Sequence, residues 1–406
     1  MRIALLILGV ILVTGCGADL LLWTRFAGDL EMERKLCEFQ LCNSSEWLGA
    51  AEGGLAKNLP SSPVQAVSRH RFLLQRDPSY PFRWAELGEA LDSIQSKQDA
   101  AYCFRQAVAL APHWPPVLMR AASFYFRSGD SQSAFPLCSQ ALDKAEQYDA
   151  FIFSLYLSQA NIGDVLRYGF PEGNPRPARS FLRFAIQNGN VASTRAVWNW
   201  LSQKDYLNDQ SAAAYVNFLL VRHSPQEASA VWKQYLGPHA GDYGKSNFIF
   251  NGGFESVPVG AGLDWMITPQ KGIQVIRDDK NYDSGHSALR IAFDGTQNLT
   301  DTGVKQIVVL PKGSYRFRAR IRTEEITTDQ GIYFQLLPLD QAPPCQWKST
   351  PWSGTNPWST VEVFFTVPGE GGAYLIKLVR NESIKIDSLI AGTVWIDSLG
   401  ITSARR

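Results

Sequence analysis

The spacing of apolar residues changes twice along the chain of 406 residues. Residues 3–13 form an unbroken apolar run behind Arg2. From about residue 63 to residue 237, apolar positions recur with the period of amphipathic helices. From Asn247 onward, short apolar runs are separated by Gly, Pro, Asn and Asp, which is typical of antiparallel strands. The pattern predicts a multidomain chain in which a helical part is followed by a β-sandwich.

The helical part contains an internal repeat of 34 residues. This distance separates Pro78 from Pro112, and it separates Ala100 from Ala134. A second set of pairs at the same distance reaches Trp232, so helical hairpins are expected to continue to about Leu236. Small side chains at repeated positions let the two helices of a hairpin approach closely, and the prolines stop each second helix.

One repeat unit matches a known pattern. Residues 81–114 carry the following positions: Trp84, Leu87, Gly88, Ala100, Phe104, Ala107 and Pro112. In residue type and spacing this unit resembles a tetratricopeptide repeat. The resemblance implies a solenoid over residues 63–237, with a concave surface that docks a protein or peptide partner. The alternative is a passive spacer with no ligand.

The β part shows period-two alternation in three segments, residues 315–322, 361–367 and 373–380. In the first segment one face is apolar, and the other face carries four arginines, Arg316, Arg318, Arg320 and Arg322. Guanidinium groups bind carboxylates with bidentate geometry, so this face is a candidate site for an acidic polysaccharide. The alternative is a solvated face on which acids of neighbouring strands, such as Glu362, pair with the arginines.

Four short motifs follow one another in the β part: Asn-Gly-Gly-Phe-Glu at 251–255, Asp264-Trp265, Ser-Gly-His-Ser-Ala-Leu-Arg-Ile at 284–291, and Gly-Thr-Val-Trp-Ile-Asp-Ser-Leu at 392–399. In order and spacing they resemble the carbohydrate-binding modules of the group that pools families four and nine. The resemblance implies a galactose-binding-like jelly roll over residues 247–406, after a linker at 238–246, that binds polysaccharide without catalysis. It also implies a structural calcium ion on Glu255 and Asp397, which could instead be hydrogen-bond partners only.

Sugar-binding modules stack the apolar face of a pyranose on an aromatic ring. Trp347, Trp352 and Trp358 cluster around a loop rich in Gly, Pro and Ser, so they are the predicted aromatic platform. The alternative is that one or two of these rings, Trp358 in particular, close the end of the sandwich. Trp265 and Trp395 are expected in the core.

The N-terminal 27 residues predict an anchor that attaches the chain to a membrane outside the cytoplasm. Val13-Thr14-Gly15-Cys16 resembles a bacterial lipobox, which implies lipidation of Cys16. The alternative is a single span over residues 3–23. Residues 28–62 are read as a linker with a short helix. In this segment Cys37 and Cys42 could form a small disulfide or remain inert thiols. Cys103 and Cys138 are expected as buried free thiols within helices.

The charge balance and the absence of two catalytic motifs argue against some classes of function. Thirty-nine Lys and Arg balance 38 Asp and Glu, which argues against a nucleic-acid partner. The sequence holds no Gly-x-Ser-x-Gly or His-Glu-x-x-His motif, and no catalytic residue is assigned. The expectation is a non-enzymatic adaptor, needing no cofactor, in the periplasm or envelope and serving exopolysaccharide assembly or export. Two alternatives stay open: a protein scaffold that binds no sugar, and an accessory subunit of glycoside hydrolysis.

Overall fold

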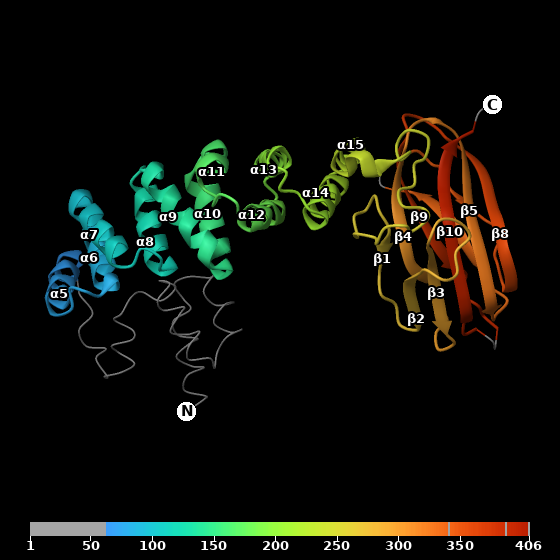
Figure 1. Ribbon diagram of the computed structural model, residues 1–406, viewed down its shortest axis with the longest axis horizontal. Coiled ribbons are helices and arrows are strands. Elements are labelled where there is room, and N and C mark those ends of the chain that lie inside the picture. The colour runs from blue at the N-terminus through green and yellow to red at the C-terminus, as the bar shows by residue number, and fades with distance from the viewer. Residues whose placement is uncertain (1–61, 340–341, 386–387, 405–406) are drawn as a thin grey trace. The chain divides into compact units, whose positions relative to one another are not determined.

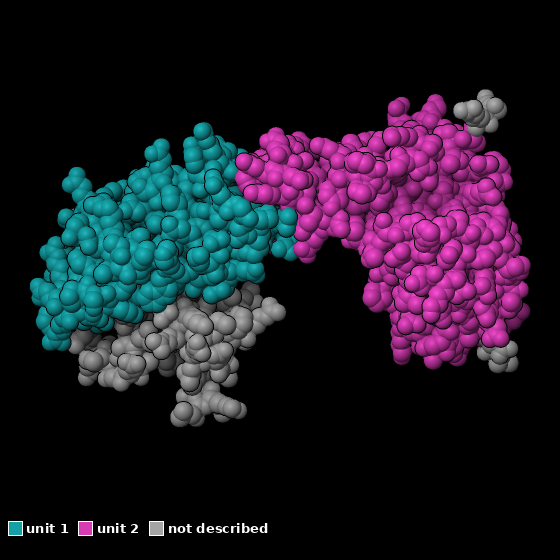
Figure 2. Space-filling view, in the orientation of Figure 1, with its two compact units in different colours: residues 1–184 teal, residues 185–406 magenta. Residues whose placement is uncertain are grey.

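The computed structural model describes residues 62–339, 342–385 and 388–404. Contacts divide the chain into two compact units, one ending at Phe184 and one beginning at Ala185 (Figure 2). The secondary structure changes from helix to strand only after Ala240. The second unit therefore contains helices together with the strands. Cys16, Cys37 and Cys42 lie outside the described residues.

Eleven α-helices precede the strands in the described part of the chain (Figure 1). Three of these helices begin 34 residues apart, at Pro81, Pro115 and Asp149, as the repeat predicts. Their bounds are α5 (Pro63–Arg76), α6 (Pro81–Ser93), α7 (Lys97–Leu110), α8 (Pro115–Arg127), α9 (Ser131–Lys144), α10 (Asp149–Gln159), α11 (Ile162–Tyr168), α12 (Arg176–Gln187), α13 (Val191–Gln203), α14 (Asp209–Val221) and α15 (Pro225–Leu236). Short 3-10 turns, η2 (Glu146–Tyr148) and η3 (Gly237–Ala240), follow α9 and α15.

Local sequence explains where the helices begin and how they pair. Proline occupies the first turn of α6, α8 and α15, where its missing N–H is not needed. The side chains of Asp130 and Asn208 accept hydrogen bonds from the first turns of α9 and α14. A Cβ added at Gly88 would lie 3.0 Å from the ring of Phe104, so α6 and α7 approach at a residue without a side chain. The predicted role of Gly88 is confirmed.

The strands form two antiparallel sheets in the second unit. Sheet B has the order β1-β4-β9-β6-β7, and sheet A has the order β2-β3-β10-β5-β8. The bounds are β1 (Met266–Ile267), β2 (Ile273–Asp278), β3 (Ala288–Asp294), β4 (Asp301–Leu310), β5 (Gly313–Ile326), β6 (Ile332–Pro338), β7 (Trp347–Lys348), β8 (Gly354–Val367), β9 (Gly372–Arg380) and β10 (Ala391–Ser403). The predicted fold class, helical hairpins followed by a jelly-roll β-sandwich, is confirmed.

The core of the sandwich lies between the two sheets. In β5, Tyr315, Phe317, Ala319 and Ile321 are buried, and they meet residues such as Phe334 of β6 across the core. The alternate residues of β5 point away from the core, as period-two alternation requires. The three predicted alternating strands correspond to β5, β8 and β9.

The last helical hairpin packs against the sandwich. Helix α15 contacts β4 and β9 of sheet B. The side chain of Asn217 in α14 accepts a hydrogen bond of 2.7 Å from the Gly262 N–H, in the loop before β1. Trp232 of α15 meets Phe250 edge to face at 5.6 Å between ring centroids. The segment predicted as a linker takes part in this packing, because Tyr243 is buried.

Candidate functional site

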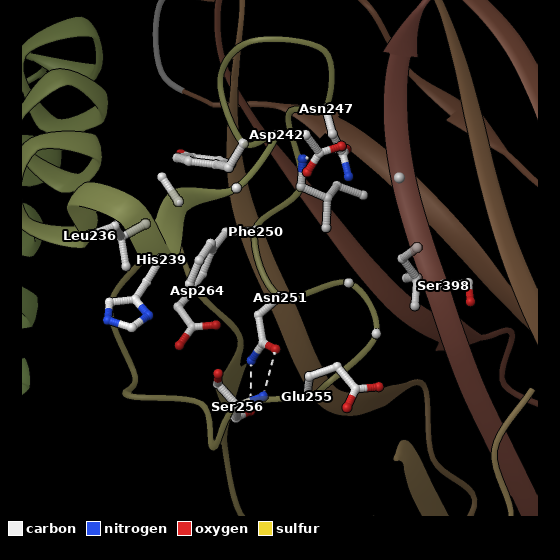
Figure 3. A pocket seen from close by; sticks show the side chains of 18 of the residues that line it. Leu236, His239, Asp242, Asn247, Phe250, Asn251, Glu255, Ser256, Asp264 and Ser398 are labelled. Atoms are coloured by element: carbon white, nitrogen blue, oxygen red, sulfur yellow. Dashed lines mark hydrogen bonds between the residues drawn. The ribbon is translucent and has the colours of Figure 1, made fainter. Parts of the chain in front are cut away.

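A pocket of about 1040 Å³ lies in the second unit between α15 with η3 on one side and β10 with β5 on the other (Figure 3). Its lining residues fall between Asp209 and Thr402. The loop that connects η3 to β1 runs through the site and carries Phe250, Asn251 and Glu255. The pocket thus combines the last hairpin and the sandwich.

The helical side of the pocket is aromatic. The ring centroid of Trp232 lies 5.6 Å from those of Tyr235 and Phe250, and the centroids of Phe250 and Tyr243 are also 5.6 Å apart. Phe250 and Tyr235 are half-buried, so part of each ring faces outward. The indole N–H of Trp232 is buried and has no hydrogen-bond acceptor among the described residues. The exposed imidazole of His239 extends this side (Figure 3).

The opposite side of the pocket is polar. Arg316 and Arg318 of β5 and Glu255 of the loop line it. Arg318 is exposed and makes no hydrogen bond or ion pair with any described residue. Its neighbour in β10 is Gly400, which has no side chain to cover the sheet beside it. Glu255 accepts the His286 N–H at 2.9 Å through one oxygen. Arg318 and the second Glu255 oxygen are therefore open to a ligand.

Asp264 is the buried acid of the pocket, with 1% of its surface exposed. Its two oxygens accept the N–H groups of Val259 at 2.8 Å and Trp265 at 2.7 Å. Burial raises the pKa of this carboxyl to about 6, although those hydrogen bonds act in the opposite direction. Asp264 thus holds the loop before β1 in shape and titrates near neutral pH.

The four arginines of β5 lie on the outer face of sheet A, as predicted, but three are paired with acids. Arg320 binds Asp283 through two hydrogen bonds of 2.9 and 2.8 Å. Arg322 lies 3.3 Å from Glu324, and Arg316 lies 3.7 Å from Glu362. This pairing supports the alternative of a compensated face. Arg318 makes no ion pair or hydrogen bond among the described residues, and Arg316 makes only the ion pair at 3.7 Å. Acidic-glycan binding by these arginines stays a prediction.

The predicted tryptophan platform is half-buried. Trp347 packs against the core, with its ring 4.9 Å from Phe317, and Trp352 also packs there. Their indole N–H groups are buried and have no acceptor in the described part of the chain. Trp358 is half-buried on β8. The alternative in which rings pack into the sandwich fits Trp347 and Trp352 rather than Trp358, and ligand binding by the three rings stays a prediction.

Of the two tryptophans expected in the core, Trp265 belongs to it. Trp395 is buried on the outer face of sheet A instead. The guanidinium of Arg322 lies 4.9 Å above its ring, and its indole N–H donates to Asp278 at 2.8 Å. The expected burial of Trp395 is confirmed, with 5% of its surface exposed, but it lies outside the cluster between the sheets and is covered by Arg322.

The carboxylates of Glu255 and Asp397, the predicted calcium ligands, both lie near Gly253. A Cβ added at Gly253 would lie 3.8 Å from the first carboxylate and 3.7 Å from the second. Asp397 is fully buried and accepts hydrogen bonds from the N–H groups of Asp283, Ser284 and Ser398 and from the Ser398 hydroxyl. A carboxylate has about four lone-pair sites, and these donors take them all. The residues fit the hydrogen-bonding alternative better than a calcium ion, which takes six to eight oxygens.

Other chemistry of the described part is limited. No group of three or more His, Cys, Asp or Glu side chains in it could hold a metal ion. Burial raises the pKa of Cys103 to about 11 and that of Cys138 to about 12, so both expected free thiols stay protonated near neutral pH. In the ranges that the structure describes, no helix is long and apolar enough to span a bilayer.

The sequence interpretation missed the aromatic side of the pocket. Trp232 was visible only as a repeat position, and Phe250 only as a residue beside the Asn-Gly-Gly turn. Their meeting depends on how the last hairpin packs on the sandwich. A local sequence pattern carries no information about that packing.

No family model matches the sequence, and no curated protein matches it. Among solved structures, the chain is similar to TmCBM61 in complex with β-1,4-galactotriose, with 18% identity and a TM-score of 0.28 over 39% of this chain and 99% of that one. It is similar to the C-terminal family 22 carbohydrate-binding module of Clostridium thermocellum Xyn10B, with 14% identity and a TM-score of 0.28 over 41% and 96%. A family 4 module has 17% identity and a TM-score of 0.28 over 38% and 99%. Each of these similarities covers about two-fifths of the chain.

Proposed function

We propose that this protein is a non-enzymatic polysaccharide-binding adaptor whose glycan site is the pocket between α15 and sheet A. One observation carries this proposal: an aromatic side, with Tyr235 and Phe250, faces a polar side, with Glu255 and Arg318, across the same pocket. A pyranose has apolar faces and a rim of hydroxyls, so it needs both kinds of surface at once.

The charges of the pocket favour a glycan rich in hydroxyls over a polyanion. Two arginines line it, against the acids Asp209, Asp242, Glu255 and Asp264. Carboxylates and guanidinium groups both bind hydroxyls, and the excess of acids over arginines disfavours a polyanion. The buried, unpaired indole N–H of Trp232 lies at the same site and suits a hydroxyl or a water molecule.

The test is binding of the full chain to an array of neutral polysaccharides. We expect Arg318→Ala and His239→Ala each to weaken the bound glycan about tenfold, which is the loss of one or two hydrogen bonds. Both residues are exposed, so folding is preserved. Lys280→Ala, an exposed cation outside the pocket, is the control. Binding that survives both pocket variants but is lost in Trp352→Ala would place the site at the tryptophan loop. No binding at all would leave the protein scaffold as the better function.

The adaptor role rests on the helical part. Hairpins with a 34-residue period form the first unit, and Phe72, Tyr102 and Leu110 are exposed on it, which suits a docked protein partner. Attachment to a membrane through Cys16 and a setting in exopolysaccharide assembly or export belong to the same proposal. Incorporation of a labelled fatty acid into the full chain, and its loss in Cys16→Ser, tests the attachment. Incorporation that persists in Cys16→Ser would contradict it.

A further inference from the structure

A row of basic side chains crosses the outer face of sheet B. Lys305 of β4 pairs in register with Lys377 of β9, Lys377 pairs with Gln335 of β6, and Gln335 pairs with Lys348 of β7. On these strands the neighbouring residues point into the core, so the four side chains share the outward face. Adjacent strands are about 4.8 Å apart, so the row extends over about 14 Å.

The positive charges of this row are poorly compensated. Lys305 and Lys377 are direct cross-strand neighbours, an arrangement of like charges that destabilises a sheet. Among the described residues one carboxylate forms an ion pair with the row, Asp301, whose oxygen lies 3.8 Å from the Lys377 ammonium. The Lys348 ammonium lies 5.3 Å above the ring of Tyr333, which holds it over the face. One carboxylate thus stands against three ammonium groups, so the row keeps an excess of positive charge among the described residues.

The residue types indicate the class of ligand. A lysine carries a mobile point charge, which suits carboxylates at variable positions along a polymer, whereas arginine suits a fixed bidentate site. The Gln335 amide lies between the lysines and both donates and accepts hydrogen bonds, as hydroxyl groups require. A span of about 14 Å exceeds a single small anion.

We propose that the row Lys305–Lys377–Gln335–Lys348 binds the acidic stretch of a uronate-bearing polysaccharide. The row and the pocket share no residue, so the two sites are separable by mutation. Helix α15 contacts β4 and β9, the strands that carry Lys305 and Lys377, so the last hairpin lies beside this surface. The face gives a negatively charged polymer a binding surface that the compensated arginines of sheet A do not offer.

The test measures binding of the full chain to oligogalacturonate and to the same oligomer after reduction of its carboxyl groups, at about 50 mM and about 200 mM salt. We expect the acidic oligomer to bind, the reduced oligomer to bind at least tenfold more weakly, and added salt to weaken the acidic complex. The double variant Lys305→Gln/Lys348→Gln should lose about tenfold in affinity, and Lys348→Glu should lose more. Lys271→Gln/Lys312→Gln, which removes two cations outside the row, should stay within twofold.

Several results would overturn the proposal. One is unchanged affinity in Lys305→Gln/Lys348→Gln with the fold intact by circular dichroism. Another is loss of oligogalacturonate binding in Arg318→Ala but not in the lysine variants, which would move the anion to the pocket. Tighter binding of duplex DNA or of phosphatidylserine vesicles than of oligogalacturonate would point to another class of partner. If no neutral glycan on the array binds, the test with oligogalacturonate is unaffected. Each of the two proposals can therefore be refuted without the other.

Discussion

The two outer faces of the sandwich both carry basic side chains, and they differ in what surrounds each charge. On sheet A, the β5 arginines meet acids from β8, from β5 itself and from the loop after β2, and the best pair has two hydrogen bonds below 3.0 Å. On sheet B, the lysines stand next to one another, and the described residues supply one ion pair at 3.8 Å. Compensated charge stabilises a fold, whereas clustered charge of one sign stabilises a complex with an oppositely charged ligand.

The largest expected effect comes from Arg380, the arginine on the strands of sheet B, whose donors are satisfied within the fold. Arg380 ends β9 with 3% of its surface exposed, and it donates to the carbonyls of Leu299, Gln330 and Ser388 at 2.9–3.2 Å. Arg380→Met should lower the free energy of unfolding of the sandwich by about 3 kcal/mol, because buried carbonyls lose their donors. Urea unfolding followed by near-ultraviolet circular dichroism measures it. Lys377→Met on the same strand, the control, should change it by less than about 0.5 kcal/mol. Equal effects would remove the distinction between structural and ligand-binding cations.

The next effect concerns Asp264. Its pKa of about 6 in the folded chain exceeds the 3.8 of an unperturbed carboxyl, so the folded state binds the proton more tightly. This acid therefore contributes stability at low pH, and the contribution is lost as pH rises from about 4 through about 6, by up to about 3 kcal/mol. In Asp264→Asn that part of the pH dependence should disappear, and in the exposed control Asp242→Asn it should remain. The free energy of unfolding, measured from pH 4 to pH 7.5, tests this prediction. Identical pH profiles for wild type and Asp264→Asn would contradict it.

A smaller effect compares two ion pairs directly. A double-mutant cycle on Arg320 and Asp283 should give a coupling energy of about 1 kcal/mol, because the pair is bidentate and about one-fifth exposed. The same cycle on Lys377 and Asp301, at 3.8 Å, should give less than about 0.3 kcal/mol. If the two coupling energies were equal, the charge of Lys377 would stabilise the fold rather than remain available to a ligand.

The smallest effect is expected from the lysine row itself. Lys305→Gln should leave stability unchanged or raise it by up to about 0.5 kcal/mol, since it removes a like-charge neighbour of Lys377. Lys312→Gln, in the exposed turn after β4, is the matched control and should have no effect. A loss above about 1 kcal/mol in Lys305→Gln would show a structural role for the row.

Local periodicity was sufficient to predict the helical hairpins and three long strands. The close approach at Gly88 and the outward arginines of β5 also follow from spacing alone. The sites did not follow, because each depends on partners distant in sequence. Asp283 meets Arg320 across 37 residues, and Trp232 meets Phe250 through a packed hairpin. The lysine row requires the register of four strands, and alternation within one strand carries no information about register.

The packing of the last hairpin on the sandwich also decides where this protein can be divided. A fragment that begins at residue 240 would lose Trp232, which packs on Phe250, and Asn217, which binds Gly262. The newly bared aromatic surface would favour self-association, so weak glycan binding by such a fragment would report a damaged surface rather than an absent ligand. A fragment from residue 185 keeps the compact unit whole, and its solubility should exceed that of the shorter one.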